Sequence, residues 1–127
     1  MGAPAIVMND SIVGTCTNHL VPSASGTQPA GPLPFKAPIT LGTVPTVLIG
    51  GNPAAVVGSS GPNIGAPHVG IVDPPFAAGP TTQMGRILSG SATVLIGGKP
   101  AATAQSQSTM CVAPGSLIPT VMTVLIG

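Results

Sequence analysis

The sequence has very few charged and aromatic side chains. Only 4% of its 127 residues are charged, and it contains two Phe but no Trp or Tyr. A basic patch for phosphates and aromatic rings for stacking bases are both missing, so we expect no binding to nucleic acid. Because 43% of the residues are hydrophobic, we expect the chain to be poorly soluble alone and to need an obligate protein partner.

Two kinds of hydrophobic segment are also missing. No apolar run approaches the roughly 20 residues of a membrane-spanning helix. The N-terminus lacks the basic segment and continuous apolar run of a signal peptide. We therefore expect the protein to be cytoplasmic during assembly. In that compartment, two cysteines are more often metal ligands than a disulfide.

Glycine and proline, in contrast, are abundant. The chain has 18 Gly and 16 Pro, which leave no uninterrupted window for a helix. The core must therefore be built from Val, Ile, Leu and Ala. This composition predicts an all-β fold.

One stretch occurs more than once along the chain. The residues 46–55, Thr-Val-Leu-Ile-Gly-Gly-Asn-Pro-Ala-Ala, return at 93–102 with nine of ten residues identical, and their first half returns at 123–127. Thr-Val-Leu-Ile is typical of a strand, and Gly-Gly-Asn-Pro of a tight turn. Each copy is expected to form a β-hairpin, and the copies must pack together because an isolated hairpin is marginally stable.

The repeats predict a single domain, residues 1–127, with pseudo-threefold symmetry. The copies span about 4–19, 46–68 and 93–111, and a closing strand at 121–126 is expected to complete the sheet of the first sector. In the first copy, Pro4–Met8 is expected to be a strand that turns at Asn9–Asp10 and returns at 11–14. The connectors 20–45 and 69–92 are predicted to be extended loops, each with a Pro-Phe pair.

Four ligand-type residues follow the returning strands of the three sectors. They are Cys16 and His19 in the first, His68 in the second and Cys111 in the third. Equivalent positions in pseudo-symmetric sectors converge near one axis, and two thiolates with two imidazoles suit tetrahedral Zn²⁺ better than iron. The alternatives are that these side chains are simply buried, or that Cys16 and Cys111 form a disulfide.

Other chemistry has little support in the sequence. The two carboxylates, Asp10 and Asp73, lie in turn or loop contexts typical of turn capping. A Ser-His-Asp arrangement would need a histidine already assigned to the metal. A zinc hydrolase would need an open coordination position, which four protein ligands do not leave. We therefore expect no enzyme activity.

The segments Val47–Gly58 and Val94–Ala102 resemble the Pro-Ala-Ala-Arg (PAAR) repeat of contractile injection systems, and the Pro-rich connectors are similar to the PAAR-like branch of type VI secretion and phage-tail-like particles. The resemblance implies a small pseudo-threefold β-cone whose base sits on a trimeric VgrG-like spike protein. It also implies a metal near the apex, which in that family is held by three His and one Cys. The implied function is to sharpen the spike for piercing a target envelope.

The sequence departs from the family in two respects. The family's Arg is replaced by Val56 and Thr103, and the candidate ligands are two Cys and two His. Because the sequence stops at Gly127, immediately after a predicted core strand, no effector extension is expected. The resemblance implies one copy per spike, transient contact with the target membrane, and delivery in the injection particle without a signal peptide. The alternative is an adaptor that loads a separately encoded effector through the connectors.

Overall fold

The computed structural model describes residues 2–17, 19–66, 68, 70–72, 83–110 and 113–126. This part of the chain contains strands and no helix, and so no helix that could cross a membrane. The predicted all-β fold is confirmed. The strands are β1 (Ala3–Pro4), β2 (Ser11–Cys16), β3 (Leu20–Ser23), β4 (Gly26–Pro29), β5 (Leu33–Pro38), β6 (Val44–Ile49), β7 (Asn52–Ala54), β8 (Ser60–Pro62), β9 (Met84–Ile87), β10 (Leu95–Ile96), β11 (Lys99–Pro100), β12 (Ser108–Met110), β13 (Ala113–Ile118) and β14 (Leu125–Ile126).

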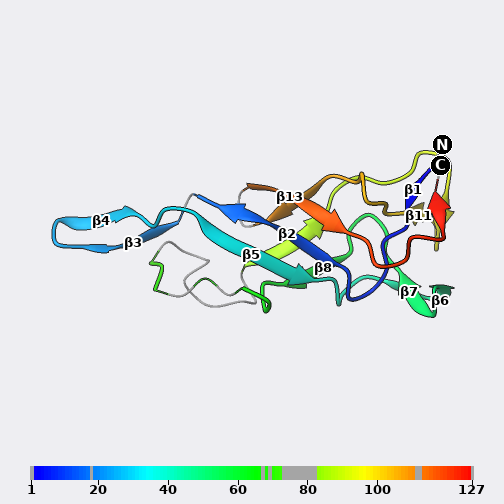
Figure 1. The fold of residues 1–127 in the computed structure, drawn as a ribbon, viewed down its shortest axis with the longest axis horizontal. Coiled ribbons are helices and arrows are strands. Elements are labelled where there is room, and N and C mark those ends of the chain that lie inside the picture. The colour runs from blue at the N-terminus through cyan, green and yellow to red at the C-terminus, as the bar shows by residue number, and fades with distance from the viewer. Residues whose placement is uncertain are drawn as a thin grey trace.

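Three small antiparallel pairs gather at one end of the elongated molecule, together with both chain termini (Figure 1). We call this end the base; it consists of β6–β7, β10–β11 and β1–β14. The first two pairs are the repeated hairpins, and each turns through two glycines with positive φ, 60° and 84° at Gly50 and Gly51 and 60° and 82° at Gly97 and Gly98. The third pair is formed by the two ends of the chain, because β14 is antiparallel to β1.

The three sectors are joined by a closed ring of backbone hydrogen bonds. The N–H of Ile6 donates to the carbonyl of Ala102 (3.1 Å), that of Ala102 to Ala55 (3.0 Å), and that of Ala55 to Ile6 (2.9 Å). Each of these residues follows the first Ala after the Pro of its copy. The ring therefore surrounds a pseudo-threefold axis, as the repeats predicted.

Away from the base, the chain forms one six-stranded antiparallel sheet with the order β5-β2-β13-β12-β9-β8. Its two outer strands, β5 and β8, approach each other. Just after β5, the N–H of Thr40 donates to the carbonyl of Ser60 on β8 at 3.0 Å, and Leu41 forms a bridge with Ser60. The sheet is thus nearly closed. Each sector contributes one strand leading away from the base and one returning to it: β2 and β5, β8 and β9, and β12 and β13.

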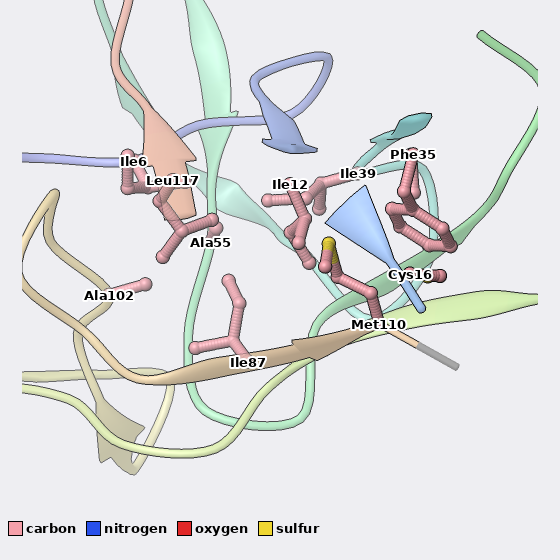
Figure 2. Close-up of a cluster of buried hydrophobic side chains, with 11 residues drawn as sticks. Ile6, Ile12, Cys16, Phe35, Ile39, Ala55, Ile87, Ala102, Met110 and Leu117 are labelled. Atoms are coloured by element: carbon pink, nitrogen blue, oxygen red, sulfur yellow. The ribbon is translucent and has the colours of Figure 1, made fainter. Parts of the chain in front are cut away.

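The interior of this sheet is filled by buried side chains from all three sectors (Figure 2). The largest is Phe35 on β5, which is 2% exposed and lies beside Cys16. The other members are Ile6, Ile12, Ala37, Ile39, Ala55, Ile87, Ala102, Met110 and Leu117. A second buried cluster lies between the base hairpins and includes Ile49, Ile96 and Ile126.

The structure corrects two expectations about the chain path. The first copy is not a hairpin by itself, because β1 pairs with β14 whereas β2 pairs with β5 and β13. The connectors are not only loops: 20–45 contains β3, β4, β5 and the start of β6, and 69–92 contains β9. Proline is tolerated here because β3, β4 and β5 are edge strands, where a missing N–H leaves no ladder partner unsatisfied. The β3–β4 hairpin projects at the end opposite the base (Figure 1).

Candidate metal centre

Three of the four predicted ligands lie together at the end of the six-stranded sheet that is opposite the base. Cys16 is the last residue of β2, His19 immediately precedes β3, and His68 lies in the connector between β8 and β9. One potential ligand atom from each lies within 4.8 Å of those of the other two. All three residues are buried, with exposed fractions of 1%, 1% and 5%.

The two imidazole rings face each other edge to face. Their centroids are 4.7 Å apart with an interplanar angle of 66°. The ring of Phe35 covers another side of His68, with a centroid separation of 5.9 Å. An apolar wall of this kind limits access of water to the cluster.

The ring of His68 is oriented by a backbone carbonyl. Its Nε2 lies 2.8 Å from the carbonyl oxygen of Pro34 on β5. A carbonyl oxygen can only accept a hydrogen bond, so Nε2 carries the hydrogen, and the lone pair of the neutral ring is on Nδ1. A hydrogen bond of this kind to the second ring nitrogen is the usual way in which a protein orients a metal-binding histidine.

The donor atoms fit a zinc ion. Two imidazole nitrogens and one sulfur, brought together from two sectors, form a set that Zn²⁺ binds as neutral imidazoles and thiolate. The fourth predicted ligand, Cys111, lies outside the described residues. The alternative disulfide between Cys16 and Cys111 also involves this residue and is therefore not tested. The residues described in this cluster can therefore supply three ligands of a tetrahedral site.

Asp10 has a structural position away from this cluster. Its carboxylate accepts hydrogen bonds from the backbone N–H of Val7 (3.0 Å) and from the hydroxyl of Thr120 (2.6 Å). The hydroxyls of Ser59 and Ser106 accept the equivalent backbone bonds in the other two sectors, at 3.0 and 2.9 Å. Asp10 thus caps a turn. The other carboxylate, Asp73, lies outside the described residues.

Sequence reasoning missed two buried amide side chains near the cluster, Asn63 and Gln83. Both are 0% exposed, and Gln83 hydrogen-bonds the backbone of His68. The chain contains many uncharged polar residues, and no local spacing distinguishes these two. Their partners are determined by the pairing of strands that are distant in the sequence.

Comparison with known families identifies one match. The family model of the PAAR motif matches residues 78–127, a segment that includes β9 to β14. The chain therefore carries a PAAR motif, and the resemblance seen in the repeats is confirmed. No curated protein and no solved structure matches the chain.

Proposed function

We propose that this PAAR-motif protein caps a trimeric VgrG-like spike of a contractile injection system, one copy per trimer, with its base against the spike. The observation that carries this proposal is a set of three exposed leucines on the base. Leu48, Leu95 and Leu125 occupy the same position in the three copies of Thr-Val-Leu-Ile, and they are 60%, 63% and 58% exposed.

The neighbouring isoleucines show that this exposure is a regular feature of the base hairpins. Ile49, Ile96 and Ile126 are each 8% exposed and pack in the core between the hairpins. Strand alternation therefore directs one side chain of each pair inward and the other outward. Three outward leucines around a pseudo-threefold axis match an apolar surface with true threefold symmetry.

The energetic gain from such docking is substantial. Full burial of a leucine side chain contributes roughly 1.5–3 kcal/mol relative to exposure. Three equivalent leucines around a pseudo-threefold axis favour a partner that presents the same surface three times. A trimeric spike presents such a surface.

The candidate metal centre supports a role for the end opposite the base as the rigid tip of the spike. We propose a closed, structural zinc site formed by Cys16, His19, His68 and Cys111, which links the outer ends of all three sectors. Zinc supplies coordination bonds there and no reaction, so the protein acts as a rigid spike tip rather than an enzyme. Such a tip is assembled in the cytoplasm and carried out with the particle, where it sharpens the spike for piercing the target envelope.

A second candidate function is that of an adaptor for a separately encoded effector. It is favoured by the β3–β4 hairpin, which projects from the end opposite the base (Figure 1) and is exposed along all of β4. Co-purification of an effector that is lost on deletion of 21–28, with spike binding retained, would support the adaptor. Retention of the effector by that variant would contradict binding through this hairpin.

The test of spike capping is a binding measurement with the purified spike trimer encoded beside this chain. We expect one copy per trimer, and Leu48→Asp, Leu95→Asp and Leu125→Asp should each weaken binding by at least about tenfold, because about 1.4 kcal/mol corresponds to that factor. The control is Leu20→Asp, which changes an exposed leucine at the opposite end. Equal binding by the base variants and the control would contradict capping through the base.

A further inference from the structure

The ligand in the second sector is held differently from that in the first. Cys16 is the last residue of β2 and pairs with Leu33 of the neighbouring strand β5. His68, in contrast, lies beyond the end of β8 at Pro62, in the connector to β9. Strand pairing therefore fixes the position of Cys16, whereas the position of His68 needs another anchor.

The side chain of Gln83 supplies that anchor. Its Oε1 accepts a hydrogen bond from the backbone N–H of His68 at 2.9 Å, and its Nε2 donates to the backbone carbonyl of His68 at 3.0 Å. The amide thus binds both backbone polar groups of one residue, as a neighbouring strand would. Because Gln83 is 0% exposed, water does not compete for these bonds.

Asn63 in turn holds Gln83 through its backbone and its side chain. Its backbone N–H donates to the carbonyl of Gln83 at 3.1 Å, which continues the β8–β9 pairing by one residue. Its side-chain Nδ2 donates to Oε1 of Gln83 (3.1 Å) and to the carbonyl of Ala66 (2.7 Å). Its Oδ1 accepts the backbone N–H of Lys36 on β5 at 3.0 Å. Asn63 therefore holds the side chain of Gln83 in place through contacts that do not involve His68.

We infer that Gln83 is a positioning residue for the metal centre, which holds the backbone of His68 so that its ring meets Cys16 and His19 whether or not a metal is bound. Pro34 fixes the direction of the ring and Gln83 fixes the place from which the ring extends. The inference rests on the proposed zinc site. Groups that orient a ligand in this way typically alter metal affinity by about 10- to 100-fold.

The mutational test compares Gln83→Met with Gln28→Met in the full-length chain. Methionine has a similar length and no strong donor or acceptor, and Gln28 is exposed on β4. In competition with a chelator, Gln83→Met should bind Zn²⁺ about 10- to 100-fold more weakly, while Gln28→Met should bind as the unaltered protein does. The visible spectrum of bound Co²⁺ should also change in Gln83→Met alone, because the coordination geometry is disturbed.

Hydrogen exchange provides a test that does not depend on the variant folding. In the unaltered protein, the amide of His68 should remain protected after Zn²⁺ is removed by a chelator, because Gln83 rather than the metal holds it. Loss of that protection on metal removal would overturn the inference, as would equal Zn²⁺ affinity of the two Met variants. If the unaltered protein binds no zinc, the proposed metal site is wrong. Protection of the His68 amide still tests whether Gln83 holds the backbone of His68.

Discussion

Ala3 and Ile126, from opposite ends of the chain, are partners in one antiparallel pair. Next to this pair, the N–H of Ala5 donates to the carbonyl of Val124 at 3.0 Å. The last strand is therefore a part of the base and not a tail. Its pairing with the start of the chain forms the third of the three antiparallel pairs of the base.

We expect a chain truncated after Pro119 to fail to fold or to bind the spike. It would lose the buried Ile126 and the partner of β1, and each fully buried apolar side chain contributes roughly 1.5–3 kcal/mol. Together with the packing of the partly buried Val121 and the hydrogen bond from Thr120 to Asp10, that loss is a large fraction of the free energy of unfolding of a small domain, roughly 5–15 kcal/mol. Circular dichroism, thermal melting and spike binding measure the effect. A truncated chain that keeps its fold and its affinity would show that the pair is dispensable.

Metal removal should lower the stability of the folded chain, although Gln83 is expected to keep holding the backbone of His68. Protein purified without added metal should contain zinc at near-stoichiometric amounts by elemental analysis, and chelation should lower the melting temperature because metal binding stabilises only the folded chain. An unchanged melting temperature would contradict a structural role for the metal.

Cys111→Ser tests the fourth ligand. This substitution should weaken zinc binding, while hydrogen exchange should stay slow at Ala55 and Ala102, which belong to the ring of backbone hydrogen bonds that joins the three sectors. Zinc binding as tight as that of the unaltered chain would remove Cys111 from the ligand set.

Two adjacent glycines in the first base hairpin should differ in their response to alanine. Both have positive φ, where a Cβ costs roughly 1–2 kcal/mol. A Cβ on Gly50 would in addition lie 2.7 Å from Cγ2 of Val121, whereas a Cβ on Gly51 would have no atom within 4 Å. Urea unfolding should therefore show a larger loss for Gly50→Ala than for Gly51→Ala. Equal losses would contradict the packing of Val121 against this turn.

Gly61→Ala should prevent closure of the six-stranded sheet. A Cβ on Gly61 of β8 would overlap the carbonyl oxygen of Pro38, and its carbonyl carbon would be 2.7 Å away. The backbone cannot yield without separating β8 from β5, so we expect a loss well above that of Gly51→Ala in the same urea measurement. A loss no larger than that of Gly51→Ala would show that these two strands are not held together.

The repeat predicted the base better than the rest of the molecule. Thr-Val-Leu-Ile followed by two glycines has one local solution, a strand and a tight turn, and the structure shows that solution. The prediction that the connectors are only extended loops was wrong, because prolines such as Pro22 and Pro34 are compatible with an edge strand as well as with a loop. Pro34 pairs with Thr15 of β2, which is distant in the sequence, whereas Pro22 pairs with Thr27 inside the local β3–β4 hairpin.

The candidate site shows the same limit. The cysteines and histidines could be selected by residue type, and Cys16, His19 and His68 do lie together. Gln83 could not be selected in this way, because its proposed positioning role depends on its pairing with Asn63 and on its two hydrogen bonds to His68. Those contacts exist only after β8 and β9 have paired.

The adjacency of the chain ends at β1 and β14 makes the backbone path almost circular, interrupted at one of three equivalent turns. Joining the ends through a short linker and reopening the chain between Gly50 and Gly51 should therefore yield a permuted protein with the same three sectors. Any domain fused at either end would emerge at the base, beside the proposed spike contact, and the end that contains Cys16 and His19 would remain unobstructed.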